Sequence, residues 1–205
     1  MNLPNKITVF RMVMVLVIVA LLLFPYQALS ISVPSIFADV NLIYFIAMIL
    51  FVVASASDFL DGYIARKYHL VTNFGKFMDP IADKLLVNGL LIILMVPSVT
   101  ASYEQFQMAM PTIAVFLMIG RDLIVDALRL LAIEQKRVLA ANKWGKAKTV
   151  LQMIAIPTVM LNNWPFSLLG SVNVALILVY LATAVSLISG IIYIVQNRDV
   201  LGGNK

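Results

Sequence analysis

Residues 42–83 read LIYFIAMILFVVASASDFLDGYIARKYHLVTNFGKFMDPIAD. An apolar run leads into Asp58 and Asp61, and a second acidic pair, Asp79 and Asp83, follows after a short connection. Carboxylates next to a membrane span are costly, and they usually serve a function. The stretch therefore predicts two neighbouring helices, joined by a short loop, that present four carboxylates to one site.

The composition of the whole chain predicts a membrane protein. Of its 205 residues, 62% are hydrophobic and only 12% are charged, whereas about 25% of the residues of a soluble domain are charged. About 20 apolar residues span a bilayer as a helix, so the length allows roughly six spans. The absence of cysteine and the single histidine exclude thiolate chemistry and multi-histidine metal sites. A metal site must therefore use oxygen ligands.

We expect one all-α membrane-embedded catalytic domain, residues 1–205, with six transmembrane helices. The expected helices are Ile7–Leu29, Phe37–Tyr68, Asp79–Pro97, Tyr103–Glu134, Trp144–Leu161 and Leu169–Gln196. All fifteen Lys and Arg residues lie near the termini, the second connection or the fourth connection. Basic connections stay cytoplasmic, so both termini are expected in the cytoplasm. We expect the first apolar segment to be retained, because its signal-peptide cleavage pattern is poor.

The spacing of the aspartates predicts a metal site. Asp58 and Asp61 are three residues apart and Asp79 and Asp83 four apart, so each pair shares a helix face. Four uncompensated carboxylates would repel one another in a poorly solvated site. Divalent ions bound by oxygen ligands relieve that repulsion, and two such ions can hold a phosphate between them. Taken singly, an aspartate can instead cap a helix, as Asp79 would before Pro80.

Small residues near the acids leave room for a bulky ligand. Gly62 and Gly75 have no side chain, and Ala65 lies one turn beyond Asp61. The planar guanidinium of Arg66 can grip a phosphate. We therefore expect a substrate phosphate to lie against this part of the two helices.

The chain resembles the CDP-alcohol phosphotransferase family through the signature D-x-x-D-G-x-x-A-R-x8-G-x-x-x-D-x-x-x-D. All eight fixed positions match, namely Asp58, Asp61, Gly62, Ala65, Arg66, Gly75, Asp79 and Asp83. The resemblance implies an enzyme that depends on Mg²⁺ or Mn²⁺, with two ions, and that is often a homodimer.

The same resemblance implies roles for individual residues. Asp58, Asp61 and Asp79 would be metal ligands, and Asp83 would be the general base and a further metal ligand. The CDP-lipid would contact Asp61 and the small or basic positions of the signature, which are Gly62, Ala65, Arg66 and Gly75.

The N-terminal run PNKITVFR, residues 4–11, resembles the phosphatidylglycerophosphate synthase branch of that family. This resemblance implies that Asn5 and Thr8 assist in binding the CDP-lipid and that Arg11 binds the acceptor phosphate. The alternative interpretation is structural, with Thr8 at a helix start and Arg11 as an interfacial residue.

The alcohol acceptor is less directly indicated. Arg121, Lys146 and Lys148 are our candidate residues for an acceptor phosphate, and a helix start near the lysines also favours an anion. The runs 120–122 and 143–149 are similar to the same branch, which implies glycerol 3-phosphate as the acceptor. The lysines can alternatively serve only as positive-inside residues.

The expected reaction transfers the phosphatidyl group of CDP-diacylglycerol to glycerol 3-phosphate at the cytoplasmic face of the cell membrane. Its products would be phosphatidylglycerophosphate and CMP, and no nucleic acid is involved. A CDP-diacylglycerol–serine or inositol-type transferase is the alternative within the class. A small cation transporter would need acids across the full membrane depth, whereas the acids gather near one side. A structural subunit would leave the aspartates unexplained.

Two further patterns concern helix packing. Ala182, Ser186 and Gly190 form a small-residue stripe, which packs within the bundle or forms the seam of a homodimer. Asp126 and Arg129 are three apart on one helix, so we expect them to pair.

Overall fold

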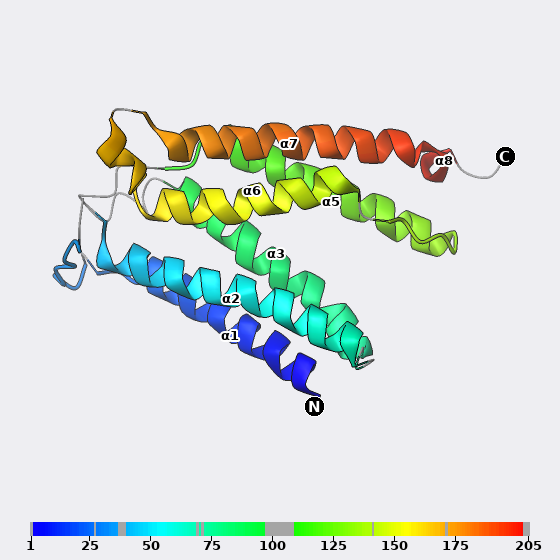
Figure 1. Cartoon of the computed structure of the whole chain (residues 1–205), viewed down its shortest axis with the longest axis horizontal. Helices are drawn as coiled ribbons and strands as arrows, with labels where there is room; N and C mark the ends of the chain where they lie inside the picture. The colour runs from blue at the N-terminus through cyan, green and yellow to red at the C-terminus, as the bar shows by residue number, and fades with distance from the viewer. Residues whose placement is uncertain are drawn as a thin grey trace.

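The computed structural model describes residues 2–26, 28–36, 40–68, 70, 72–96, 109–140, 142–170 and 172–202, with the backbone alone at Arg66. The described residues form α-helices and one short 3-10 helix, which confirms the all-α class (Figure 1). The helices are α1 (Leu3–Leu23), α2 (Leu42–Lys67), α3 (Asn73–Met95), α5 (Thr112–Glu134), α6 (Lys143–Met160), η1 (Phe166–Leu169), α7 (Val174–Gln196) and α8 (Arg198–Leu201).

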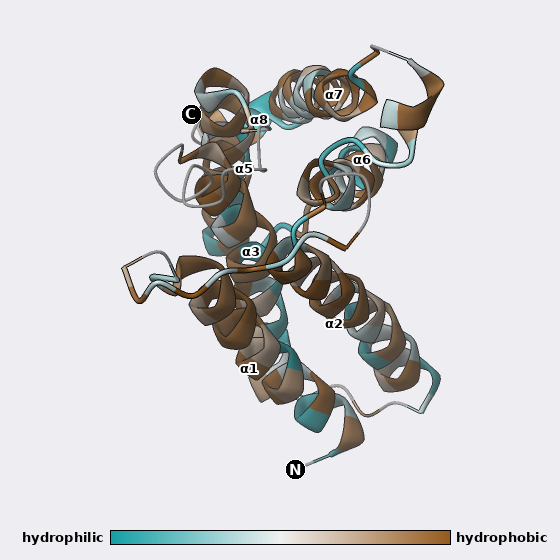
Figure 2. Ribbon diagram, turned by 90° about the vertical axis from the view of Figure 1, so that its left-hand side faces the viewer, coloured by the Kyte–Doolittle hydropathy of each residue, from teal (hydrophilic) through white to brown (hydrophobic). Residues whose placement is uncertain are grey.

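The long helices run side by side along the longest axis of the molecule (Figure 1). Both ends of the chain, the α2–α3 connection and the α5–α6 connection lie at the same end of the bundle. Viewed from the opposite end, α3 lies between α1 and α2 on one side and α5, α6 and α7 on the other (Figure 2). The helix arrangement therefore brings the basic connections together at one end.

Helix α1 lies against both α2 and α3, which contact each other less extensively than either contacts α1. The sequence predicted α2 and α3 as direct neighbours around a shared acidic site. Helices α2 and α3 do contact each other, and the N-terminal half of α1 also lies against their acidic side chains, through Thr8 and Arg11. Any site built from the acids of α2 and α3 therefore also includes side chains of α1.

The start of α3 differs from the sequence prediction. The helix begins at Asn73 rather than Asp79, and Thr72 is its N-cap, since the Thr72 hydroxyl accepts a hydrogen bond from the Gly75 amide at 3.0 Å. A capping hydroxyl satisfies an amide that has no partner within the helix. Asp79 is therefore not a cap but lies inside α3, one turn after Gly75 and on the same face.

Three helices are long and apolar enough to cross a membrane by themselves: Leu3–Leu23, Leu42–Ala65 and Val174–Gln196. Helices α3 and α5 have 23 residues each and α6 has 18, enough for about 27 Å or more at 1.5 Å per residue. These three carry most of the charged residues of the two cavities described below, which lowers their hydropathy. The chain is a membrane protein with three candidate spans among the described residues.

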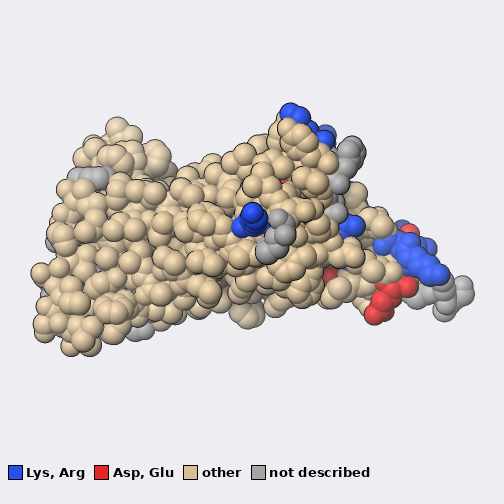
Figure 3. All heavy atoms as spheres, turned by 90° about the horizontal axis from the view of Figure 1, so that it is seen from below, with Lys and Arg blue, Asp and Glu red and all other residues tan. Residues whose placement is uncertain are grey.

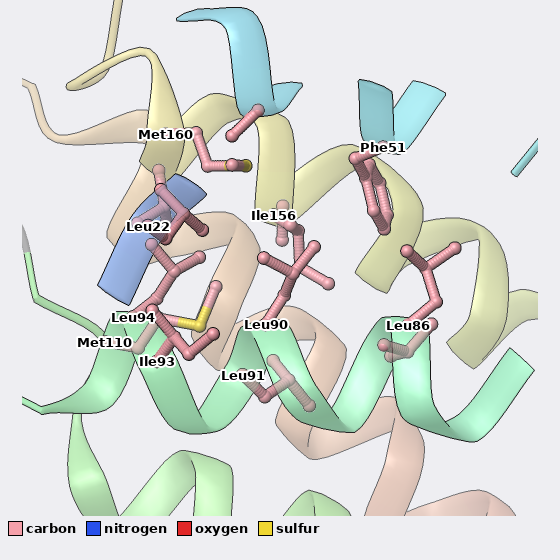
Figure 4. Close-up of a cluster of buried hydrophobic side chains, with 14 of the residues drawn as sticks. Leu22, Phe51, Leu86, Leu90, Leu91, Ile93, Leu94, Met110, Ile156 and Met160 are labelled. Atoms are coloured by element: carbon pink, nitrogen blue, oxygen red, sulfur yellow. The ribbon is translucent and has the colours of Figure 1, made fainter. Parts of the chain in front are cut away.

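On the face shown in Figure 3, the charged side chains of the described residues lie between the middle of the molecule and the end that holds the termini, and none of them is seen at the opposite end. A large cluster of buried side chains between the helices is apolar. Leu22 of α1, Phe51 of α2, Leu90 of α3 and Ile156 of α6 are each at most 2% exposed and belong to one cluster (Figure 4). Close packing of these side chains sets the helix positions, and so also the positions of the polar groups at the charged end.

The small-residue stripe of α7 packs within the bundle. Ala182 is 1% exposed and Ser186 is fully buried, and Gly190 is also buried. Because neighbouring helices of the same chain cover these residues, the stripe is not available as the seam of a homodimer.

Candidate active site

Arg11 of α1 lies between the two acids of α2. Its Nη1 forms an ion pair with Asp58 Oδ1, and its Nη2 forms an ion pair with Asp61 Oδ2. The Arg11 side chain is fully buried, and that of Asp61 is only 4% exposed. Arg11 Nε has no hydrogen-bond partner among the described residues. A buried guanidinium of this kind is stable only beside opposite charge, which the acidic pair supplies.

Thr8, one turn before Arg11, connects α1 to the acid of α3. Its Oγ1 donates a hydrogen bond to Asp79 Oδ1 at 2.7 Å and lies 3.5 Å from Asp61 Oδ2. A hydroxyl has a single proton to donate, so the shorter contact with Asp79 is the principal one. Thr8 is 1% exposed. It therefore holds the acids of two helices beside one another.

Asn5, one turn before Thr8, meets the start of α3. Its Oδ1 accepts a hydrogen bond from Thr72 Oγ1 at 2.7 Å. A methyl group at Gly75 would lie 3.4 Å from both of these oxygens and 3.6 Å from Asp79 Oδ2. The absence of a side chain at Gly75 therefore keeps the space between α1 and α3 open to a ligand.

A small cavity of about 50 Å³ lies among these groups, large enough for an ion with a water molecule but not for a nucleotide. Its lining includes five of the seven residues predicted to bind the CDP-lipid: Asn5, Thr8, Asp61, Ala65 and Gly75. Gly62 is not in that lining. The Arg66 side chain lies outside the described residues.

Sequence reasoning missed two polar residues of this cavity, Thr72 and Lys76. The signal for Thr72 was present, because threonine followed by Asn-Phe-Gly is a plausible capping sequence. The prediction that this helix starts at Asp79 left Thr72 in the preceding loop, so its capping role was not recognised.

The acids extend from this cavity as a chain of interacting charges. Asp61 interacts electrostatically with Asp58 and Asp79, and Asp83 interacts with Asp58. Arg11 forms ion pairs with two of these four carboxylates, those of Asp58 and Asp61, so the acids outnumber the one cation that pairs with them.

The donor chemistry of this cluster fits a hard divalent cation. Among the described residues, however, no three acidic or histidine side chains are arranged as a set of metal ligands. Asp58 and Asp61 point toward Arg11 and Asp79 points toward Thr8. The carboxylates are therefore of the right chemical type to bind a divalent cation, and their role as ligands stays a prediction.

A second, larger cavity of about 220 Å³ opens between α3, α5, α6 and α7. Its lining holds five cationic side chains and three acidic ones, an excess of two positive charges. The cations are Lys84, Arg121, Arg129, Lys146 and Lys148, and the acids are Asp83, Asp122 and Asp126. The structure thus brings together three of the four residues predicted to bind the acceptor phosphate. Arg11 does not line this cavity.

Ion pairs to Asp122 hold two cations of the larger cavity, Arg121 and Lys148, in place. Asp122 Oδ1 lies 3.0 Å from Arg121 Nη1, and Asp122 Oδ2 lies 2.5 Å from Lys148 Nζ. Lys148 is 6% exposed, whereas Lys146 is exposed and has no ion pair in the described part of the chain. Asp122 therefore orients one cation from its own helix and one from α6.

The predicted pair of Asp126 with Arg129 is wrong. Asp126 forms its ion pair with Lys84 of α3. Arg129 donates from Nε to the Tyr193 hydroxyl at 3.1 Å, and its guanidinium carbon lies 5.4 Å from the centre of that ring. Partners on neighbouring helices compete with a partner on the same helix, and the sequence spacing cannot reveal them.

Asp83 connects the two parts of the site. It lines the larger cavity and interacts electrostatically with Asp58 on one side and with Lys148 and Asp122 on the other. A ligand bound by the cations can therefore present a hydroxyl group to Asp83. This arrangement is suited to joining an anionic alcohol to a group held by the aspartate cluster.

The chain is similar to known proteins over nearly its whole length. The sequence profile of the CDP-alcohol phosphatidyltransferase family matches residues 1–188. A protein of Bacillus subtilis (strain 168) named CDP-diacylglycerol–glycerol-3-phosphate 3-phosphatidyltransferase is 39% identical over 200 residues, covering 98% of this chain and 97% of its own. Proteins with the same name from Mycoplasma pneumoniae and Haemophilus influenzae are 36% and 31% identical, over 95% and 94% of this chain and 87% and 91% of theirs. The chain belongs to the CDP-alcohol phosphatidyltransferase family.

Proposed function

We propose that this chain transfers the phosphatidyl group of CDP-diacylglycerol to glycerol 3-phosphate, giving phosphatidylglycerophosphate and CMP. The observation that carries the proposal is Asp83, which lies between the aspartate cluster and a cavity with two excess positive charges. A phosphate monoester carries close to two negative charges at neutral pH, so it matches that cavity. The names of the three near full-length relatives support the same reaction.

The proposed mechanism has one chemical step. Arg121, Lys146 and Lys148 bind the phosphate of glycerol 3-phosphate, which brings its hydroxyl to Asp83. The Asp83 carboxylate accepts the hydroxyl proton while the oxygen forms a bond to the lipid-side phosphorus of the donor. The bond from that phosphorus to the oxygen of the CMP phosphate breaks, and this oxygen keeps the electron pair. The rate enhancement therefore comes from positioning the two substrates and from stabilising the charge that develops during the transfer.

Asp58, Asp61, Asp79 and Asp83 are the proposed ligands of two divalent ions, Mg²⁺ or Mn²⁺. When bound, such ions neutralise charge on the diphosphate. Asn5, Thr8, Asp61, Gly62, Ala65, Arg66 and Gly75 are the proposed contacts of the CDP-lipid. The lining of the small cavity supports five of these seven assignments.

The proposed topology has six spans with both termini and the site at the cytoplasmic face of the cell membrane. Six helices of 18 residues or more among the described ranges, and the shared end of both termini, support it. Because the chain has no cysteine, single cysteines introduced at Asn2, Val138 and Leu168 can report topology. In intact cells, an impermeant maleimide should label the last position only. Labelling of the first two would reject the orientation.

A homodimer is proposed from the family resemblance.

The substrate assignment is tested by CMP release from CDP-diacylglycerol with purified protein and Mg²⁺. Glycerol 3-phosphate, serine and inositol are compared at equal concentrations. We expect release with glycerol 3-phosphate and a lipid product that retains an additional phosphate. Faster release with serine or inositol would reject the acceptor, because neither molecule uses the excess charge of the cavity.

A further inference from the structure

The Arg121 side chain lies against the face of α7 that Ser189 and Gly190 form. Its Nη2 donates a hydrogen bond to Ser189 Oγ at 2.6 Å. The stem of the side chain passes over Gly190, where a methyl group would lie 2.8 Å from Arg121 Cγ and 3.5 Å from its Nε. The side chain of Arg121 is only 11% exposed. Gly190 therefore provides the space for this arginine, and Ser189 holds its tip.

Ser189 is itself held by the start of α6. The Asn142 side chain caps this helix by accepting the Gly145 amide at 2.6 Å, and its Nδ2 donates to the Ser189 carbonyl at 3.4 Å. Ser189 Oγ lies 3.5 Å from Asn142 Oδ1 and can donate to it while accepting from Arg121. Ser189 is fully buried. Ser189 therefore has a fixed position relative to α6, the helix that carries Lys146 and Lys148.

We propose that Ser189 and Gly190 are positioning residues that determine the specificity for a phosphorylated acceptor by holding Arg121 in the cationic cavity. The inference rests on the proposed function. It gives the small-residue stripe of α7 a role beyond packing, since its last member makes room for a charged side chain. Neither residue contacts the reacting atoms, so both act through Arg121.

Substitution at either position disturbs Arg121 by a different route. Gly190→Ala places a methyl carbon against the middle of the Arg121 side chain. That side chain must then move away from α7. The helix itself is not weakened, because alanine favours a helix more than glycine does. Ser189→Ala creates no clash and removes one hydrogen bond to a charged group, a loss of roughly tenfold in binding.

The test measures CMP release by the purified full-length protein in lipid–detergent micelles. Glycerol 3-phosphate is varied at saturating CDP-diacylglycerol, and the donor is varied at saturating acceptor. We expect both variants to raise the KM for glycerol 3-phosphate about tenfold, with kcat and the donor KM within about twofold of wild type. Gly89→Ala is the matched control, because a methyl group there meets nothing within 4 Å, and it should change none of the three constants.

A second measurement shows whether Ser189 acts through Arg121. In an Arg121→Ala background, Ser189→Ala should add less than twofold to the acceptor KM. A further tenfold increase there, an unchanged acceptor KM in both single variants, or an equal increase in the donor KM would each overturn the inference. Failure of the proposed function is distinguishable, because wild-type protein would then release no CMP with glycerol 3-phosphate.

Discussion

Two lysines of α6 allow a quantitative test of the cationic cavity. Lys146 and Lys148 are two residues apart and both line the cavity, but Lys148 is 6% exposed and Lys146 is exposed. A methionine at either position keeps much of the apolar stem and removes the charge. Lys148→Met leaves Asp122 paired with Arg121 at 3.0 Å, so the substitution does not isolate a buried acid.

The magnitude follows from the difference in burial. A hydrogen bond to a charged partner contributes about 1.5–3 kcal/mol, so loss of the buried ammonium should raise the KM for glycerol 3-phosphate roughly 10- to 150-fold. Water and salt screen the exposed ammonium, so Lys146→Met should raise that KM less than about fivefold. The donor KM should change little in either variant, because neither lysine lines the small cavity.

The assay is the initial rate of CMP release over a range of glycerol 3-phosphate concentrations at fixed ionic strength. Circular dichroism and size-exclusion chromatography confirm that the variants retain the wild-type fold. Repeating the series at higher salt should shrink the effect of Lys146→Met more than that of Lys148→Met. Equal effects of the two substitutions, or a larger effect of Lys146→Met, would refute the assignment of the buried lysine to the acceptor phosphate.

Three further predictions concern the aspartate cluster. Asp83→Asn should lower kcat by roughly 10²- to 10⁴-fold while CDP-lipid binding, measured by equilibrium dialysis, persists; near wild-type turnover would exclude Asp83 as the base. Thr8→Val removes the 2.7 Å hydrogen bond to Asp79 and should raise the Mg²⁺ concentration for half-maximal rate about two- to tenfold; an unchanged metal requirement counts against a metal role for Asp79. Gly75→Ala narrows the cavity between α1 and α3 and should raise the donor KM with an unchanged acceptor KM; the reverse pattern would contradict the assignment of this cavity to the donor.

The sequence by itself indicated the class of protein and the chemical character of its site. Its hydrophobic content indicated a membrane protein. The spacing of four aspartates indicated that they belong to one acidic site, namely Asp58, Asp61, Asp79 and Asp83. Such features depend on local composition and helix period, which a linear pattern records directly. The predicted cationic residues Arg121, Lys146 and Lys148 indeed share one cavity.

Only the tertiary structure decided which of these groups meet. It placed Arg11 between Asp58 and Asp61 rather than in the cationic cavity, and it paired Asp126 with Lys84. It also showed that Gly190 makes room for Arg121. These contacts join different helices, and they arise from the close packing of α1 against α2 and α3 and of α5 against α3 and α7. Helix period orients a side chain about its own axis, whereas packing between helices determines its partner.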